Sequence, residues 1–301
     1  MNSESILIVG TGALGTLFAA RLSAAGIPVS VLGTWQAGLA ALHQKGACLE
    51  GFGCYPVQTL EETAAGDPTR YALVLVKSWQ TGRAARQLSG YLAQDGLAVS
   101  LQNGLGNAEI LAGVLGSSRA AQAVTTLGAT LLAPGLVRLA GSGPIWMEAS
   151  PGLGRLPEML IQAGYEVKII SDVRSLVWGK LVVSSAINAL TALLRIKNGE
   201  LLETPAARAL MGALASETAS VAGMLGVDLP FQDPVKATEE VALRTAGNLS
   251  SMLQDVMRGS PTEVNAINGA VVHLAEAGKI KVPVNQIILS LVESLPVHGK
   301  I

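Results

Sequence analysis

The sequence predicts an α/β protein in which an N-terminal, Rossmann-type doubly wound sheet is followed by an all-α domain. Three observations indicate this fold class. Short apolar strands alternate with helices in the first half, a glycine-rich turn at residues 10–15 separates the first strand from the first helix, and strand signals stop near Ser171. Beyond that residue only helical periodicity continues. We therefore expect two domains, over residues 1–171 and 172–301.

The first domain shows the alternation of a parallel sheet wound by right-handed crossovers. Its strands are predicted at residues 6–9, 29–32, 73–76 and 98–101, with helices at 14–25, 36–45 and 80–93. After Asn107, turn residues at 134–135 and 141–144 punctuate three apolar runs, at 121–132, 136–140 and 145–148. This pattern is typical of a β-meander. We expect the meander to extend the same sheet, with residues 166–170 as its last strand.

The second domain is predicted to be helical throughout. A long helix begins after Asp172, a residue type that caps helix N-termini, and runs through Lys180 to about Arg195. Further helices are expected near residues 205–225, 234–246, 250–257, 262–277 and 283–295. Glycine and proline residues at the intervening positions mark the breaks between them.

Composition and charge limit the possible partners. Half of the 301 residues are apolar, 14% are charged and the formal net charge is −1, which argues against disorder and against a general attraction to nucleic acid or anionic membranes. No apolar run reaches the ~18 residues that span a bilayer. The segment Met1–Ser5 lacks the Lys or Arg of an export signal. We therefore expect a cytoplasmic protein that binds neither nucleic acid nor membrane.

The histidines and cysteines give no catalytic pattern. His43, His273 and His298 are scattered without ligand spacing, so no metal site is predicted. Cys48 and Cys54 lie close together in a glycine-rich segment, where a disulfide is conceivable. Two thiols in a large chain without a signal peptide favour the reduced, inert state, which is our expectation.

A G-x-G-x-x-G motif lies between the first strand and the first helix. Its six residues are Gly10, Thr11, Gly12, Ala13, Leu14 and Gly15. In this context the first glycine permits a tight turn, the second lets a pyrophosphate approach the backbone, and the third lets the helix pack against the strand. The helix N-terminus then meets the phosphate charge. The motif predicts dinucleotide binding; the alternative is a glycine turn with an empty switch point.

The choice of dinucleotide is determined where the second strand ends. An acidic residue there would bind the ribose hydroxyls of NAD and repel a 2′-phosphate. No Asp or Glu occurs between Ser30 and Leu49, and Thr34 can donate a hydroxyl hydrogen bond. The sequence therefore favours NADP(H), although no Arg is present either and NAD(H) is not excluded.

Polar residues follow two later strands of the predicted sheet. Lys77 and Gln80 come after the strand 73–76, and Asn103 follows the strand 98–101. The carboxyl ends of parallel strands meet at one edge, which is where ligands bind in this class of fold. We expect these side chains to bind the cofactor, with solvated loop groups as the alternative.

A polar stripe runs along the long helix of the second domain. Lys180, Ser184 and Asn188 recur at four-residue spacing and share one face of an otherwise apolar helix. Such a stripe must find partners or line a cavity. Together with Glu263, far downstream, Lys180 suggests a cationic acid and an anionic anchor in one cleft. The alternative is a snorkelling lysine at a domain interface.

Several spaced motifs, in this order over nearly the whole chain, resemble the ketopantoate reductase (2-dehydropantoate 2-reductase) family. They are the glycine loop, residues 77–80, 102–104, 178–181, 188–192, 198–199, Asn248 with 250–255, and 261–263 with 267–269. The resemblance implies a Rossmann domain followed by a helical domain like that of 6-phosphogluconate dehydrogenase. It also implies reduction of ketopantoate, a small-molecule 2-oxo acid, to pantoate with NADPH, on the route to pantothenate and coenzyme A.

The same resemblance implies roles for individual residues. Lys180 would be the general acid, and Glu263 would bind the substrate hydroxyl and orient the lysine. Ser251 would hydrogen-bond the substrate carboxylate. Asn103, Asn188 and Asn248 would position the substrate and the nicotinamide. We also expect Ser184 and Asn198 to bind the substrate. The residues expected to contact the cofactor are Asn103, Glu263, Thr34, Lys77 and Gln80. Asn268 matches another recurring asparagine whose role the resemblance does not specify.

Two departures from the family pattern leave alternatives open. Ser184 stands where the family usually has asparagine, and Thr34 stands where it often has arginine. A shorter side chain at 184 widens the pocket and favours, as the runner-up, a reductase of another branched 2-oxo acid. A non-catalytic NADP(H)-binding protein is the third possibility. Both a monomer and a homodimer are compatible with the sequence.

Overall fold

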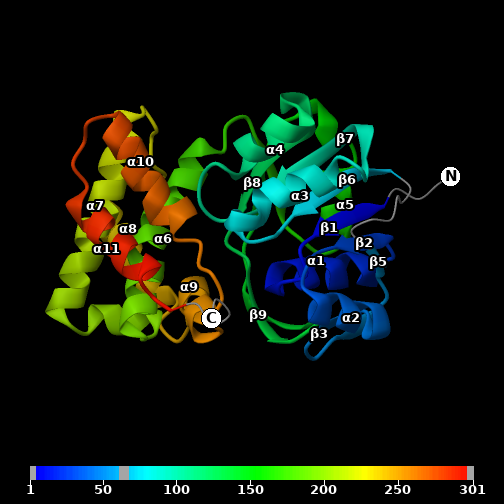
Figure 1. The fold of residues 1–301 in the computed structure, drawn as a ribbon, viewed down its shortest axis with the longest axis horizontal. Coiled ribbons are helices and arrows are strands. Elements are labelled where there is room, and N and C mark those ends of the chain that lie inside the picture. Colours follow the sequence, from blue (N-terminus) through cyan, green and yellow to red (C-terminus); the bar gives the residue numbers. More distant parts are fainter. Residues whose placement is uncertain (1–4, 61–67, 297–301) are drawn as a thin grey trace. The chain divides into compact units, whose positions relative to one another are not determined.

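The computed structural model describes residues 5–60 and 68–296 and forms two compact units (Figure 1). Unit 1 contains Met1–Gln102 and Gly106–Val173, and unit 2 contains Asn103–Leu105 and Arg174–Ile301. The division therefore falls at Val173 rather than at Ser171, and a short segment of the first half belongs to the helical unit. The expectations that concern Met1–Glu4 and His298 lie outside the described residues.

Unit 1 is built on an eight-stranded sheet with the strand order β12-β11-β8-β7-β6-β1-β2-β5. Its strands are β1 (Ile6–Val9), β2 (Val29–Leu32), β5 (Gln58–Leu60), β6 (Thr69–Val74), β7 (Leu92–Ser100), β8 (Ala120–Thr125), β11 (Ile145–Glu148) and β12 (Val167–Ile170). The ladders from β5 to β8 are all parallel, as the alternation of strands and helices predicts. Only β11 runs antiparallel to its neighbour β8.

Helices cover both faces of this sheet, and β1 shows why. Ile6 and Ile8 point into a core shared with α1 (Ala13–Ala24) and α5 (Leu156–Gln162). Leu7 and Val9 point to the other face, into a core shared with α3 (Thr81–Leu88) and α4 (Asn107–Leu115). Because alternate side chains of a strand point to opposite faces, a strand buried on both faces is apolar at every position.

The predicted meander is wrong, because the chain from 120 to 148 divides between two sheets and β12 pairs with β11 in parallel. β9 (Gly128–Ala133) and β10 (Leu136–Gly141) leave the large sheet and form a four-stranded sheet with two strands from residues 47–55, in the order β4-β3-β10-β9. These are β3 (Ala47–Leu49) and β4 (Gly53–Tyr55). The second sheet packs on α1. Three-residue strands carry too few positions for a periodic signal, so β3, β4 and β5 were not predicted.

The structure corrects the expectation for the cysteines. Cys48 and Cys54 form a disulfide, with their Cα atoms 3.9 Å apart. They are directly opposite one another in the antiparallel β3–β4 ladder. Residues that face each other across such a ladder bring their side chains into contact, so the hairpin itself supplies the proximity. Chain length and cellular compartment are unrelated to this register, so they did not predict the pairing.

Unit 2 is helical, as predicted. Its helices are α6 (Arg174–Leu194), α7 (Pro205–Met224), α8 (Pro234–Arg244), α9 (Ser251–Met257), α10 (Ala270–Ala277) and α11 (Pro283–Glu293). The helix expected over 262–277 is not continuous, because a π-helical turn at Asn265–Gly269 precedes α10. Within the described residues, α6 alone has the length and hydropathy of a membrane span, and 61% of its apolar window is buried inside the protein, as in a core helix.

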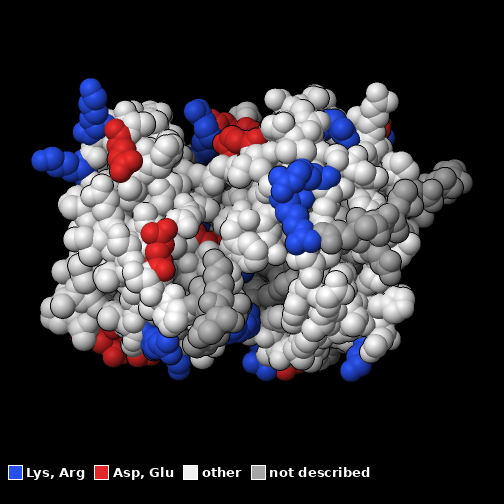
Figure 2. All heavy atoms as spheres, viewed as in Figure 1, with Lys and Arg blue, Asp and Glu red and all other residues white. Residues whose placement is uncertain are grey.

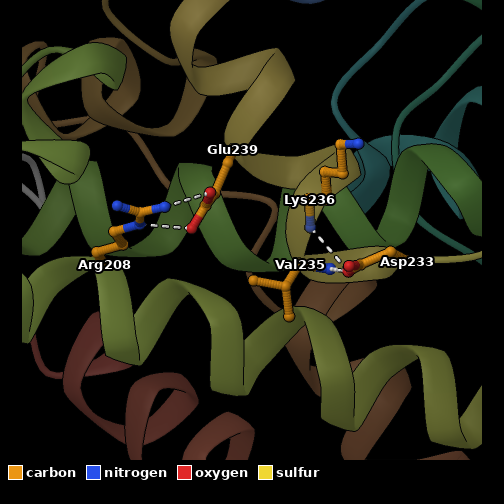
Figure 3. Close-up of polar contacts among 5 residues, drawn as sticks. All are labelled: Arg208, Asp233, Val235, Lys236 and Glu239. Carbon is orange, nitrogen blue, oxygen red and sulfur yellow. Dashed lines mark hydrogen bonds and ion pairs between the residues drawn. The ribbon is translucent and has the colours of Figure 1, made fainter.

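Charged side chains fix helix ends and helix pairs on the outside of unit 2. The guanidinium of Arg208 on α7 donates two hydrogen bonds, of 2.6 and 2.7 Å, to the carboxylate of Glu239 on α8 (Figure 3). Asp233 caps α8 by accepting from the backbone N–H groups of Val235 and Lys236. On the face drawn in Figure 2, most of the surface is uncharged and the Lys and Arg side chains lie in small, separate groups.

Candidate functional site

The glycine loop of unit 1 has the backbone geometry of a dinucleotide turn. Gly10 has φ +126°, and a Cβ atom on it would lie 2.9 Å from the Leu75 carbonyl. A Cβ atom on Gly15 would lie within 2 Å of the Gly10 carbonyl oxygen (1.9 Å), so α1 can approach β1 only with glycine there. Gly12 is exposed, and a Cβ atom on it would meet nothing within 4 Å. The open space over Gly12, at the N-terminus of α1, fits a pyrophosphate.

The ends of β2 and β6 meet through a side-chain contact. Gln80 Nε2 donates to Thr34 Oγ1 at 3.4 Å, and both side chains are half-buried. A hydroxyl that accepts this bond still carries its own proton and can donate it to a phosphate oxygen. The structure therefore brings together two of the residues expected to bind the cofactor. Lys77 is half-buried at the same end of β6.

Gln102 is a structural contributor to this edge that sequence reasoning did not single out. Its side-chain amide donates to the Val76 carbonyl at 3.1 Å and to Thr81 Oγ1 at 2.7 Å. Thr81 Oγ1 in turn donates to Asn107 Oδ1 at 2.8 Å. These bonds join the end of β7 to the segment that carries Lys77. A glutamine directly after a buried strand is the only local signal for such a role.

In unit 2 the structure brings together three of the predicted residues. Asn103 Nδ2 donates to Glu263 Oε2 at 3.3 Å across 160 positions of sequence. Glu263 is buried, and its carboxylate interacts electrostatically with the ammonium of Lys180. Burial lowers the pKa of Lys180 to about 8, and the negative charge of Glu263 partly opposes that shift. Asn103, expected at the edge of the sheet, thus belongs to the lysine–glutamate cluster.

This arrangement suits the general acid expected at Lys180, a role that stays a prediction. A lysine whose pKa lies near neutrality exchanges its proton at the pH where the protein operates, whereas an ordinary lysine holds it too tightly. The neighbouring carboxylate keeps the ammonium form populated. Lys180 itself lies half-buried on the polar stripe of α6, one turn before Ser184 and two turns before Asn188, which are also half-buried.

The segment that carries Ser251 is fastened to α6. Ser250 caps α9 by accepting from the Leu253 N–H at 3.1 Å, and it accepts a 2.7 Å hydrogen bond from Thr191 Oγ1 of α6. Ser251 is therefore in the first turn of a helix anchored beside the polar stripe. Its role toward a carboxylate stays a prediction.

Asn198 and Asn248 meet each other through the backbone. The Asn198 N–H donates to the Asn248 carbonyl at 3.1 Å, and Asn198 Nδ2 donates to Thr245 Oγ1 at 2.9 Å. Asn198 is buried and Asn248 is exposed. These contacts hold the turn before α9 against the turn at 198–202, which is a structural role. Substrate contacts of the two side chains stay predictions.

The chain matches two family descriptions that together cover most of its length. The description "Ketopantoate reductase PanE/ApbA" matches residues 6–152, and "Ketopantoate reductase PanE/ApbA C terminal" matches residues 172–295. A 2-dehydropantoate 2-reductase of Archaeoglobus fulgidus is 35% identical over 98% of this chain and 99% of its own.

Solved structures agree with this assignment. The PanE/ApbA family ketopantoate reductase of Ralstonia eutropha JMP134 has a TM-score of 0.90 and 30% identity, over 97% of this chain and 98% of its own. D-mandelate dehydrogenase, solved with NADH and anilino(oxo)acetate, shares the fold with a TM-score of 0.89 at 22% identity, over 96% of this chain and 97% of its own. This chain is an oxidoreductase that belongs to the ketopantoate reductase family.

Proposed function

We propose that this protein catalyses the NADPH-dependent reduction of 2-dehydropantoate (ketopantoate) to pantoate, a step of pantothenate and coenzyme A biosynthesis, in the cytoplasm. The observation that carries the proposal is the cluster in unit 2, where Asn103 binds Glu263 and Glu263 acts on the ammonium of Lys180. The membership of the family and the identity to curated 2-dehydropantoate 2-reductases support the choice of substrate.

Lys180 acts as the general acid in this reaction. As the ketone carbon becomes tetrahedral, negative charge develops on the carbonyl oxygen, and the ammonium stabilises that charge and donates a proton to the oxygen. With a pKa of about 8, Lys180 is mostly protonated at neutral pH and releases its proton readily. The alcohol forms when this oxygen receives the proton.

Glu263 has two tasks in the proposed reaction. Its carboxylate accepts a hydrogen bond from the substrate hydroxyl, and its charge keeps Lys180 protonated against the cost of burial. Asn103 fixes one carboxylate oxygen by donating to it. Ser251, Ser184, Asn188, Asn198 and Asn248 supply the hydrogen bonds that orient the substrate carboxylate and carbonyl.

The cofactor is held by unit 1, whose glycine loop fits a dinucleotide. When bound, the nicotinamide supplies the hydride. Thr34, Gln80 and Lys77 favour a 2′-phosphate by offering hydroxyl, amide and ammonium donors, and no acidic residue follows β2 to repel it. The solved complex of D-mandelate dehydrogenase contains NADH, so NAD(H) is the competing cofactor within this fold.

One assay tests reaction, substrate and cofactor together. The absorbance of NADPH and of NADH is followed in separate reactions, each with ketopantoate present. We expect rapid oxidation of NADPH and slow oxidation of NADH. If ketopantoate accelerates oxidation of neither cofactor, the proposed activity is wrong; faster oxidation of NADH would reverse the cofactor assignment alone.

A second candidate, favoured by Ser184, is reduction of another branched 2-oxo acid. Ser184 is half-buried one turn from Lys180 and has a shorter side chain than asparagine, which leaves room for a different substrate. A panel of branched 2-oxo acids, assayed by kcat/KM with NADPH, separates this candidate from the first. A protein that binds NADP(H) but turns over no member of the panel would instead be a non-catalytic nucleotide-binding protein.

A further inference from the structure

A chain of three buried or half-buried polar side chains runs through the apolar core of unit 2. Glu217 of α7 accepts three hydrogen bonds of 2.9 Å from the start of α11: the backbone N–H groups of Val284 and Asn285, and Asn285 Nδ2. Asn285 Oδ1 accepts from Asn268 Nδ2 at 3.0 Å. Asn268 Nδ2 also donates to the Ser185 carbonyl of α6 at 3.0 Å. We call Glu217, Asn285 and Asn268 the amide relay.

The relay ends on the segment that carries Glu263. Asn268 lies in the π-helical turn Asn265–Gly269, and the backbone carbonyl of Glu263 accepts from Ala266 and Ile267 in this turn. The same segment is also held by Asn103, through Glu263 Oε2, and by the Leu105 N–H, which donates to the Ala266 carbonyl at 2.9 Å. Asn268 therefore ties the backbone around Glu263 directly to α6, the helix of Lys180.

The tie to α6 is made from a turn with unusual backbone geometry. The Gly269 N–H donates to the Val264 carbonyl, which places one more residue in the turn than an α-helix has. One extra residue rotates the side chains that follow by about 100°. π-helical turns are rare and occur frequently at functional sites. Asn268 is the fourth residue of this turn, and its two side-chain hydrogen bonds hold the turn against α6 and Asn285.

Asn268 also carries a buried polar atom that does not contribute to the stability of the fold. Asn268 and Asn285 are both completely buried, and within the described part of the chain Asn268 Oδ1 has no hydrogen-bond partner. A buried acceptor without a partner destabilises the folded state. Apolar side chains at both 268 and 285 would avoid that cost, so the amide is better explained by the position it enforces than by the stability it adds.

We infer that Asn268, held by Asn285 and Glu217, is a positioning residue that fixes the π-helical turn against α6 so that the Glu263 carboxylate faces Lys180. The inference rests on the proposed function, because that function gives the interaction between Glu263 and Lys180 its role in catalysis. It assigns no chemical step to Asn268, which acts only through Glu263. Loosening the relay should therefore change the environment of Lys180 as well as the rate.

The test compares Asn268→Leu with a matched control, Thr218→Val. Thr218 is completely buried, is next to Glu217 on α7, and bonds the side chain of Ser185 at 2.9 Å, so its loss removes a buried polar contact to the same residue of α6 without touching the π-helical turn. Thermal unfolding, kcat and KM are measured for both variants. The pKa of Lys180 is measured by NMR titration of isotope-labelled lysine, with its signal assigned from the spectrum of Lys180→Arg.

We expect Asn268→Leu to lower kcat roughly 10- to 100-fold, the scale of a small misplacement of catalytic groups. We also expect the pKa of Lys180 to fall below its wild-type value, because Glu263, which raises that pKa, moves away. Thr218→Val should lower the melting temperature but leave kcat within twofold and the pKa unchanged. If Asn268→Leu and Thr218→Val lose similar stability and neither moves the pKa or kcat, the positioning role is overturned.

A second variant keeps the inference testable if Asn268→Leu does not fold. Glu217→Gln preserves the shape of the relay but replaces one of its two accepting oxygens. It should move kcat and the pKa of Lys180 in the same directions by a smaller amount, and unchanged values would overturn the inference. The titration needs no substrate. The wild-type protein could therefore fail to turn over ketopantoate while the relay variants still change the pKa of Lys180. That result would contradict the proposed function and support the positioning role.

Discussion

The glycine loop of unit 1 and the lysine cluster of unit 2 are built by opposite means. The loop is six consecutive residues, and its chemistry is supplied by the backbone at the N-terminus of α1. The cluster is three side chains, Asn103, Lys180 and Glu263, gathered from distant parts of the sequence. A site made of contiguous backbone is specified locally, whereas a site made of separated side chains exists only in the folded unit. Substitutions should therefore act differently in the two sites.

Removing the lysine gives the largest expected effect. We expect Lys180→Met to lower kcat by roughly 10²- to 10⁴-fold, the usual contribution of a general acid. NADPH affinity should stay near the wild-type value, because Lys180 is not among the proposed cofactor contacts. Steady-state kinetics and fluorescence titration measure the two quantities. The control is Lys236→Met, at an exposed position of α8, which should keep kcat within twofold. Near-normal turnover of Lys180→Met would show that another group donates the proton.

The pH dependence of the reaction rate tests the lysine cluster without involving the glycine loop. Only the ammonium form of Lys180 donates a proton, so kcat/KM for reduction should be constant below pH 8 and fall tenfold per pH unit above about 8, the lowered pKa of this residue. The reverse oxidation needs the neutral amine and should rise through the same pH. In Glu263→Gln the break should move to lower pH, because the carboxylate that raises the pKa is gone. A profile that stays flat to pH 10 would contradict the assignment.

Two glycine substitutions separate the structural and binding tasks of the loop. In Gly15→Ala the new Cβ meets the backbone of Gly10, so we expect a loss of about 1–3 kcal/mol in unfolding free energy. In Gly12→Ala nothing lies within 4 Å, so stability without cofactor should stay within about 0.5 kcal/mol. Affinity for NADPH should nevertheless fall about tenfold or more, since a methyl group occupies the approach of the pyrophosphate.

Urea unfolding and fluorescence titration of NADPH measure these effects on both glycine variants. Unchanged affinity in Gly12→Ala would mean that the pyrophosphate binds elsewhere. Equal destabilisation of the two variants would mean that the tight approach of α1 to β1 is not set by Gly15.

The disulfide should give the smallest effect, confined to stability. Cys48 and Cys54 close a loop with a sequence separation of 6, for which the chain-entropy argument gives about 2 kcal/mol. We expect Cys54→Ser to lower the unfolding free energy by up to that amount and to leave kcat unchanged, because the bond lies in neither site. Addition of a reductant should shift the wild-type unfolding curve to that of the variant. A wild-type curve that ignores reductant would show that the thiols are not paired in solution.

Prediction from sequence succeeded where the signal was local and repetitive. Ile6–Val9, followed by the glycine motif and a helix, indicated the parallel sheet, and the apolar periodicity after Ser171 indicated the helical unit. It failed at β3, β4 and β5, whose three residues carry no usable period, and at the π-helical turn, which has the same apolar spacing as the α-helix expected there. The pairing of Cys48 with Cys54 depends on a hairpin register that their spacing alone did not reveal.

The sequence by itself determined the class of fold and the glycine loop, and its resemblance to a family predicted which residues react. Only the tertiary structure decided that Asn103 joins Glu263 and that burial brings the pKa of Lys180 to about 8. The physical reason is that backbone turns and helix periods follow from neighbouring residues. Desolvation and charge–charge interaction instead depend on which distant groups the fold packs around a side chain.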